Sequence, residues 1–273
     1  MKQIIAPVDF SDASFNSAKY AAALANVYGA ELILLHAYTN PGSIDSLPVK
    51  IEENDHRALP AILNSLINEK ADILRRQYTV PIHTVLQEGD TVGVIENTAE
   101  QYDQPLIVMG AKGKGKSNSI FGSTTSFFIQ WVRYGVLAVP EWCTFHSFEN
   151  LTIAIDLDAQ TRPGIFEMIR KLCVPFDPFI SLLYVSDDRS ETTAPRSLQT
   201  MIASKALSQI RHGFFIIHDD DVDDGIEDFL EKHPSDLLVM FSRKRNIFQR
   251  IFQKSKSYEM AGKSKIPLLV LPG

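Results

Sequence analysis

The sequence has few cysteines and no long apolar run. Its two cysteines, Cys143 and Cys173, do not form a C-x-x-C motif, so neither a zinc knuckle nor a dithiol redox motif is supported, and a disulfide framework is not expected. No apolar run approaches the roughly 20 residues that a membrane-spanning helix needs. The start, MKQIIAPVDFSD, meets Asp9 too early for a secretory signal peptide. We therefore expect a cytosolic protein with no membrane partner.

The chain also lacks an excess of positive charge. Its 27 lysines and arginines are outnumbered by 33 aspartates and glutamates, which gives a net charge of −6. This balance weighs against nucleic acid or an anionic membrane as the main partner. What is present is the composition of a globular protein, 45% hydrophobic and 22% charged. A chain of 273 residues allows one large domain or two of ordinary size.

Short apolar segments alternate with amphipathic ones along the first half of the chain. The apolar segments predict buried strands at 4–9, 31–38, 80–87, 105–110 and 136–140. The amphipathic segments predict helices at 13–28, 57–77, 91–102 and about 124–134. The residues expected to face inward include Phe15 and Ala18 in the first helix, Leu59, Ile62, Leu66 and Ile73 in the second, and Phe127, Phe128, Trp131 and Val132 in the fourth.

The second half repeats this order of elements. The matching segments are LTIAID (151–156) with IIAPVD, FISLLYV (179–185) with ELILLHAY, and PLLVLP (267–272) with VLAVP. A repeat of about 140 residues predicts two domains, at 1–145 and 146–273. Because apolar strands alternating with helices favour parallel sheets covered on both faces, we expect each domain to be a five-stranded, doubly wound α/β domain.

A glycine-rich loop follows the strand expected at 105–110. Residues 110–117 spell G-A-K-G-K-G-K-S, which matches the phosphate-loop pattern G-x-x-x-x-G-K-[ST]. In a P-loop NTPase the helix would begin at once with Lys116 and Ser117. A better helix start lies at Ser123, which is a good N-cap ahead of an apolar stripe. The position of the helix start therefore separates a P-loop enzyme from another kind of phosphate-binding loop.

Three features are expected to converge on one crevice. Asp9, Ala37 and the loop at 110–124 all lie at the carboxyl ends of expected strands, where ligands bind in open α/β sheets. The loop glycines let backbone N–H groups turn toward an anion, and the helix N-terminus attracts phosphate by roughly 0.3–1 kcal/mol. Asp9 can accept a hydrogen bond from ribose or adenine, or it can be a helix-capping or turn residue. His36 is interpreted as a structural histidine rather than a catalytic one.

These residues resemble the universal stress protein family. The nucleotide loop of that family is G-x-x-G, nine residues, then G-[ST], between the fourth strand and the last helix. Here the motif stands as Gly110, Gly113, Gly122 and Ser123, with eight residues between the second and third of these glycines. The strand-end Asp9 also fits. The resemblance covers the whole chain as two tandem copies, and it implies that they pack as an intramolecular pseudo-dimer, with a homodimer as a further assembly.

The resemblance implies ATP or another adenine nucleotide as the ligand, with Mg²⁺ accompanying the phosphates. It places adenine near the Ala37 backbone, and the phosphates on the glycine loop. The nucleotide-binding residues that it implies are Pro7, Val8, Asp9, Ala37, Met109, Gly110, Lys112, Gly113, Gly122, Ser123 and Thr124. No catalytic residue or protein metal ligand is expected. Because no general base is evident, the most that we expect is slow ATP hydrolysis.

The second copy lacks the glycine loop. DLLVM (236–240) is followed by FSRKRNIFQRIFQKSKS, with no glycine where the first copy has its loop glycines. We therefore expect one nucleotide per chain, and a structural role for the second copy. The basic residues within 243–256 are interpreted as a solvated helix face. Three functions stay open: an ATP-binding stress-response and signalling module, a P-loop ATPase or phosphotransferase using Lys116, and a structural or interaction protein that binds no nucleotide.

Overall fold

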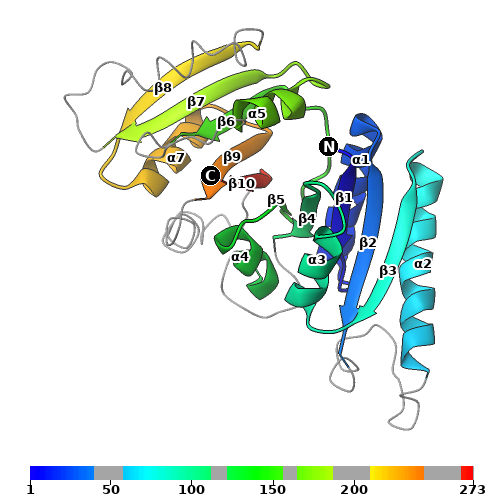
Figure 1. Cartoon of the computed structure of the whole chain (residues 1–273). Helices are drawn as coiled ribbons and strands as arrows, with labels where there is room; N and C mark the ends of the chain where they lie inside the picture. The colour runs from blue at the N-terminus through cyan, green and yellow to red at the C-terminus, as the bar shows by residue number, and fades with distance from the viewer. Residues whose placement is uncertain (40–57, 112–121, 156–164, 187–209, 243–265, 273) are drawn as a thin grey trace. The chain divides into compact units, whose positions relative to one another are not determined.

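The chain forms two compact units, drawn in Figure 1 from a computed structural model. The residues that the structure describes are 1–39, 58–111, 122–155, 165–186, 210–242 and 266–272. The first unit consists of Met1–Phe128 and Tyr134–Phe145, and the second of Ile129–Arg133 and His146–Gly273. Among the described residues, no helix is both long and apolar enough to cross a membrane.

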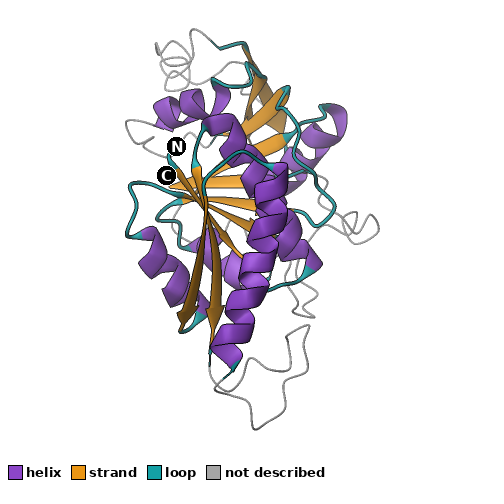
Figure 2. Cartoon of the chain, turned by 90° about the vertical axis from the view of Figure 1, so that its right-hand side faces the viewer, coloured by secondary structure: helices purple, strands orange, loops and turns teal. Residues whose placement is uncertain are grey.

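Strands alternate with helices throughout the first unit. Its elements are β1 (Gln3–Pro7), α1 (Asp12–Tyr28), β2 (Glu31–Tyr38), α2 (Leu59–Gln77), β3 (Ile82–Glu88), α3 (Thr91–Ala99), β4 (Leu106–Gly110), α4 (Ser123–Gln130) and β5 (Gly135–Val139). Adjacent strands pair in parallel in the order β3-β2-β1-β4-β5. Helices flank the strands on both sides in Figure 2. The expected five-stranded, doubly wound domain is confirmed.

The second unit repeats this architecture. Its described elements are β6 (Asn150–Ala154), α5 (Ile165–Cys173), β7 (Phe179–Ser186), β8 (His212–His218), α7 (Val222–Lys232), β9 (Leu237–Ser242) and β10 (Leu268–Pro272). Adjacent strands are again parallel, in the order β10-β9-β6-β7-β8. This is the strand order of the first unit, so the expected α/β class holds for both copies.

The likeness of the two units extends to single hydrogen bonds. Just beyond β1, the N–H of Val8 donates to the Leu35 carbonyl at 2.8 Å, and just beyond β6 the N–H of Ile155 donates to the Leu183 carbonyl at 2.8 Å. These bonds occupy equivalent places in the two sheets. The repeat inferred from sequence is therefore also a repeat of strand-end geometry.

Helix α1 begins and ends at the residues that its sequence predicts. Ser11 is the N-cap, and its hydroxyl accepts from the N–H of Ser14 at 3.1 Å. Gly29 ends the helix in the left-handed region, at φ 61°. Phe15, which was expected to face inward, lies only half-buried, and lysine ammonium groups stand 4.9 Å from its ring centre. The alanines make up much of the buried face: Ala18, Ala21, Ala22 and Ala25.

The buried face of α2 differs from the expected one. Leu59 is buried as expected, but Ile62, Leu66 and Ile73 are only half-buried. The residues that complete the buried face are Leu63, Ile67, Ala71 and Leu74. Two apolar stripes lie side by side on this helix, and the small Ala71 belongs to the stripe that packs inward. The sequence pattern alone gave no reason to prefer that stripe.

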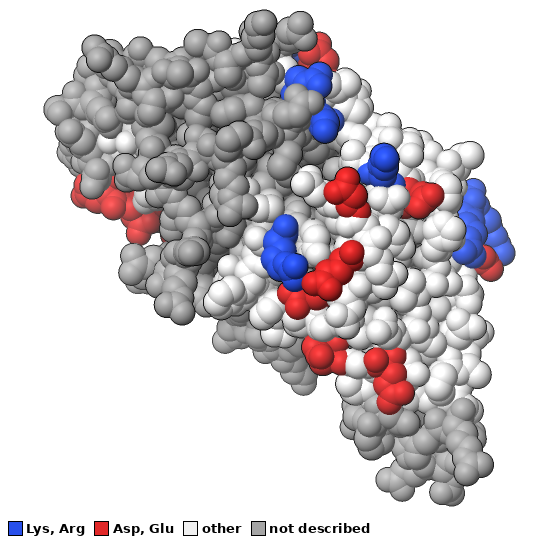
Figure 3. Space-filling model, viewed as in Figure 1, with Lys and Arg blue, Asp and Glu red and all other residues white. Residues whose placement is uncertain are grey.

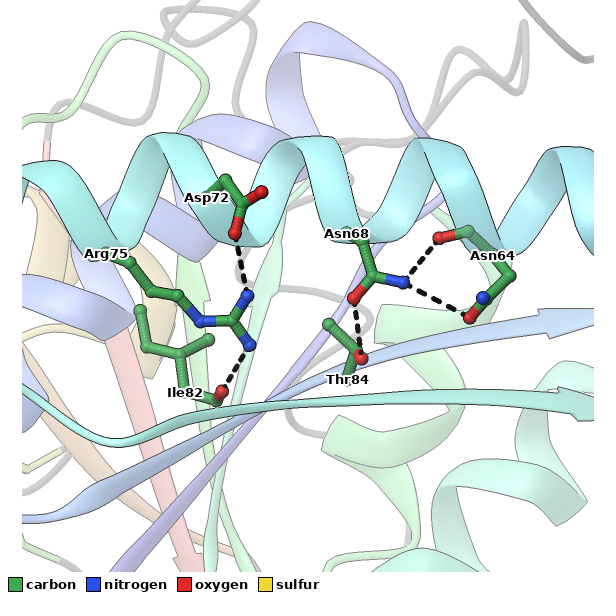
Figure 4. Close-up of polar contacts among 6 residues, drawn as sticks. All are labelled: Asn64, Asn68, Asp72, Arg75, Ile82 and Thr84. Carbon is green, nitrogen blue, oxygen red and sulfur yellow. Dashed lines mark hydrogen bonds and ion pairs between the residues drawn. The ribbon is translucent and has the colours of Figure 1, made fainter.

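Polar side chains fix α2 on β3 (Figure 4). The Arg75 guanidinium donates to the Ile82 carbonyl at 2.7 Å and also binds Asp72 at 2.8 Å. About two turns before Arg75 in the helix, the Thr84 hydroxyl donates to the Asn68 side-chain oxygen at 3.1 Å. These contacts join the helix to β3, the edge strand of the unit.

Helix α4 is shorter than expected. It ends at Gln130, because β5 already begins at Gly135 and the residues between must turn the chain back to the sheet. Phe128 is buried as expected, but Trp131 lies beyond the helix and is 58% exposed. Gly135 was expected to end the helix and is instead the first residue of the strand.

Candidate functional site

The candidate site lies at the carboxyl edge of the first sheet, between β1 and β4. These strands are neighbours, and the chain leaves β1 toward β2 but leaves β4 toward β5, on the opposite side. A reversal of this kind opens a crevice beyond the strand ends, where α/β sheets bind ligands. Pro7, Val8 and Asp9 lie at the end of β1, on one side of this point. Met109 and Gly110 lie at the end of β4, on the other side.

The turn after β1 is held from both sides. Val8 donates its N–H to the Leu35 carbonyl at 2.8 Å, and its own carbonyl lies 2.7 Å from Nδ1 of His36. Phe10 stands at φ 60°, a conformation uncommon outside glycine, and its ring lies 4.3 Å from the His36 ring. Strand β1 ends at Pro7 and not at Asp9 as expected, and the Val8 carbonyl lies beside Nδ1 of His36.

Asp9 holds the beginning of α1. Its carboxylate accepts from the N–H of Ser11 at 3.0 Å and from the Ser11 hydroxyl, and its N–H donates to the Ser14 hydroxyl at 3.2 Å. The structure thus gives Asp9 the turn role that was the alternative to ligand binding. A carboxylate has about four acceptor sites, so this structural role leaves the ligand-binding hypothesis in place.

The two ends of the glycine loop are tied to each other. Past the end of β4, Ala111 donates its N–H to the Val139 carbonyl at 2.8 Å, and the Ala111 carbonyl accepts from the N–H of Gly122 at 2.7 Å. The Thr125 hydroxyl donates to the Gly110 carbonyl at 2.9 Å. These bonds clamp the start of α4 against the end of β4. The stretch 112–121, with the predicted ligands Lys112 and Gly113, lies outside the described residues.

The N-terminus of α4 offers backbone donors in its first turn. Among the described residues, the first hydrogen bond into the helix runs from the N–H of Ser126 to the Gly122 carbonyl at 2.9 Å. The N–H groups of Ser123 and Thr124 lie ahead of that bond, and such groups form anion-binding sites. Gly122, rather than the expected Ser123, is the residue just before the helix. The Gly122 N–H already donates to the Ala111 carbonyl. Gly122 can therefore serve an anion site through the position of its backbone, and not as a donor.

Ala37 comes from the neighbouring strand. It is the second-last residue of β2 and pairs in register with Gln87 of β3, so it lies at the same carboxyl edge. The described residues of the predicted set thus all lie at the ends of β1, β2 and β4 or at the start of α4. Sequence reasoning missed the roles of His36 as a clamp on Val8 and of Thr125 as a clamp on Gly110.

Charge and metal chemistry give little further definition. Figure 3 shows one face of the molecule, on which the acidic and basic side chains of the described residues lie in small mixed groups, without an extended basic area. Within the described ranges, no group of three or more histidine, cysteine, aspartate or glutamate residues could hold a metal ion.

The comparisons with known proteins match the first half of the chain to a family and nearly the whole chain to a fold. The model of the universal stress protein family matches residues 1–140. A universal stress protein of Methanocaldococcus jannaschii is 29% identical over 149 residues, covering 51% of this chain and 82% of that protein. The crystal structure of a universal stress protein from Archaeoglobus fulgidus matches 99% of this chain and 96% of its own, with a TM-score of 0.69 and 17% identity.

A second solved structure covers half of the chain. It is a universal stress protein in complex with cAMP, which matches 50% of this chain and 96% of its own at 23% identity, with a TM-score of 0.37. That similarity is too low to bear on the fold. The family match covers more than half of the sequence, and the A. fulgidus structure shares the fold along nearly the whole of it. The chain belongs to the universal stress protein family.

Proposed function

We propose that this protein binds ATP, or another adenine nucleotide, in its first unit and acts as a stress-response binding and signalling module in the cytosol. The observation that carries the proposal is the clamp between Gly110 and Thr125 at the sheet's reversal point. It holds the start of α4, the proposed phosphate site, against the end of β4, the strand next to β1. No general base for hydrolysis is evident, so binding rather than catalysis is the proposed activity.

In the proposed pose, each part of the nucleotide lies on the groups that suit its chemistry. The phosphates lie on the N–H groups of Ser123 and Thr124 and on the glycine loop, whose lysines add positive charge. The ribose or the base forms hydrogen bonds with groups at the end of β1, where Asp9 lies. The adenine lies against Pro7 and the Ala37 backbone. Mg²⁺ accompanies the phosphates without a dedicated protein cage.

The start of α4 weighs against the P-loop alternative. That alternative needs a helix beginning at Lys116, whereas α4 begins at Ser123, as the stress-protein hypothesis predicts. Lys116 itself lies outside the described residues. A structural protein that binds no nucleotide is the second alternative, and it predicts no heat in a titration with ATP.

The second unit is proposed to be structural. We infer that residues 1–145 and 146–273 act as two domains that pack as an intramolecular pseudo-dimer, and that the second domain does not bind nucleotide. Phe241, in β9, stands where the first copy has Gly110. The further assembly into a homodimer is an additional hypothesis.

Calorimetric titration with ATP and Mg²⁺ tests the proposal. We expect one nucleotide per chain, because one glycine loop is present in the sequence. A stoichiometry near two would contradict the proposed asymmetry of the two copies. An absence of heat at every accessible concentration, with the fold intact by circular dichroism, would favour the structural alternative.

A further inference from the structure

We propose that β8, the edge strand of the second unit, is the surface on which two copies of this chain form a homodimer. In that dimer, the free edge of β8 pairs antiparallel with the same edge of a second copy. This interface rests on the homodimer hypothesis stated above and not on nucleotide binding. Its support is the difference between the edge strands of the two units.

Strand β8 lies at the end of its sheet and is apolar. Among the described strands, it pairs with β7 alone (Figure 1). Its sequence, HGFFIIH (212–218), contains no proline and no lysine, arginine, aspartate or glutamate. None of its residues is buried, whereas most residues of the neighbouring β7 are. An apolar edge of this kind is a template for pairing with another strand.

The equivalent edge strand of the first unit, β3, is protected against such pairing. Its first residue is Ile82, whose carbonyl accepts from the Arg75 guanidinium of α2 at 2.7 Å. This carbonyl lies on the free edge, because the preceding Pro81 carbonyl binds Leu32 of β2 at 2.9 Å and successive residues alternate sides. A positive charge therefore occupies the β3 edge. The strand also has polar residues where β8 has phenylalanine, isoleucine and histidine: Thr84, Gln87 and Glu88.

The backbone groups on the free edge of β8 follow from its pairing with β7. Ile180 of β7 donates its N–H to the Arg211 carbonyl at 2.8 Å, and Asp219 donates its N–H to the Ser186 carbonyl of β7 at 3.1 Å. Because successive residues of a strand point their N–H and C=O groups to alternate sides, the odd-numbered residues between these two bonds face β7. The residues whose backbone groups point to the free edge are His212, Phe214, Ile216 and His218.

The sequence of β8 is suited to pairing with its own copy. It reads nearly the same in both directions about Phe215, with Phe214 and Ile216 beside the centre and a histidine at each end. With Phe215 on a two-fold axis, Phe214 lies opposite Ile216 of the second copy. His212 then lies opposite His218 of the second copy. Each is a pair of residues that face the free edge, so each pair exchanges both of its backbone hydrogen bonds across the interface.

The side chains agree with this register. Phe214 opposite Ile216 is an aromatic and β-branched pair, which is one of the pairs that stabilise adjacent strands. At the centre, the Phe215 ring packs on α7, with its ring centre 5.0 Å from that of Phe229, so the middle of β8 is held to its own unit. Because β8 has no acidic residue, lysine or arginine, the pairing brings no such like charges opposite each other.

Size-exclusion chromatography with light scattering tests this surface. Wild type should have twice the 30.6 kDa mass of one chain. Ile216→Pro removes an N–H on the free side of β8, where an edge strand tolerates proline, so we expect a monomer with the fold intact by circular dichroism. Leu86→Pro is the matched control, because Leu86 has the same place in β3, and it should stay dimeric.

Two outcomes would overturn the proposal in different ways. A monomeric wild type at every accessible concentration would remove the homodimer itself and leave the β8 edge to a different strand. A dimeric Ile216→Pro variant would keep the homodimer and exclude β8 as its surface.

A pair of charged variants tests the register without proline. Phe214→Glu and Ile216→Lys each place a charge opposite an apolar residue of the second copy, so each variant alone should be monomeric. An equal mixture of the two should form a heterodimer, because the introduced carboxylate and ammonium groups lie directly opposite each other in the proposed pairing. Dimers of either variant alone, or a mixture that stays monomeric with both variants folded, would overturn the proposal. None of these measurements uses nucleotide, so they are decided separately from the ATP titration.

Discussion

Replacing Thr125 with valine tests whether the clamp between β4 and α4 forms the phosphate site. Valine has nearly the shape of threonine, so Thr125→Val leaves no cavity, but it removes the hydroxyl that donates to the Gly110 carbonyl at 2.9 Å. An acceptor left without its donor costs about 1–3 kcal/mol. Because Gly110 is only half-buried, water can partly replace the donor, and we expect about 1 kcal/mol in the free energy of unfolding.

Thr125→Ser is the matched control for this substitution. It keeps the hydroxyl and loses a methyl group at a buried position, which also costs about 1 kcal/mol. The two variants should thus unfold at similar urea concentrations but differ in function. We expect Thr125→Val to weaken ATP binding at least about tenfold, equivalent to about 1.4 kcal/mol, and Thr125→Ser to weaken it less than about threefold. Equal ATP affinities of the two variants in calorimetry would refute the idea that this clamp positions the phosphate-binding N–H groups.

Three further predictions concern the loop, the buried thiol and the outer helix. Gly122→Val should remove ATP binding with the fold intact. Lys116→Ala should weaken ATP binding by less than about tenfold, because a solvated lysine contributes roughly 1 kcal/mol or less. The opposite ranking of the two variants in calorimetry would identify a P-loop. Burial raises the pKa of Cys173 from 9.0 to about 12, so the unfolded chain loses this proton first and stability falls as the pH rises from about 9 to about 12. The loss should reach about 4 kcal/mol, and Cys173→Ala should remove that part of the slope in urea titrations at each pH. Arg75→Ala should destabilise the protein by about 1–2 kcal/mol, since the Arg75 guanidinium donates to a β3 carbonyl. Arg76 is exposed, and Arg76→Ala should change stability by less than about 0.5 kcal/mol. Similar losses for the two variants in thermal unfolding would contradict the role of Arg75 in holding α2 on β3.

Much of the fold could be predicted from local sequence. The strand at 31–38 was expected with the bounds that β2 has, because Gly29 fixes the helix end before it and the run is apolar throughout. The inward face of α2 could not be predicted, since its two apolar stripes differ mainly by the small Ala71. The end of α4 also depends on a non-local fact, because the start of β5 at Gly135 is set by pairing with β4.

The site could be predicted in position but not in detail. Strand ends and glycines are local signals, so the edge of the sheet that carries Asp9 and Gly110 followed from the sequence. The bond from His36 to Val8 joins residues 28 positions apart, and the bond from Thr125 to Gly110 joins residues 15 apart. Neither pairing has a periodic or compositional signature. A buried histidine at a strand end gives a hint that it has a partner, but the partner appears only when the strands are paired.

The two halves of the chain show why a fold can persist where a site does not. The bonds from Val8 to Leu35 and from Ile155 to Leu183 are backbone bonds of equal length, so any apolar strand pair of this topology can form them. The proposed site instead needs particular side chains and glycines at a few strand ends. The second unit has Tyr184 where the first has His36, and its parallel ladder still ends at the equivalent pair of residues. A universal stress protein can therefore keep a second copy as a folded partner while only the first copy keeps the groups proposed to bind nucleotide.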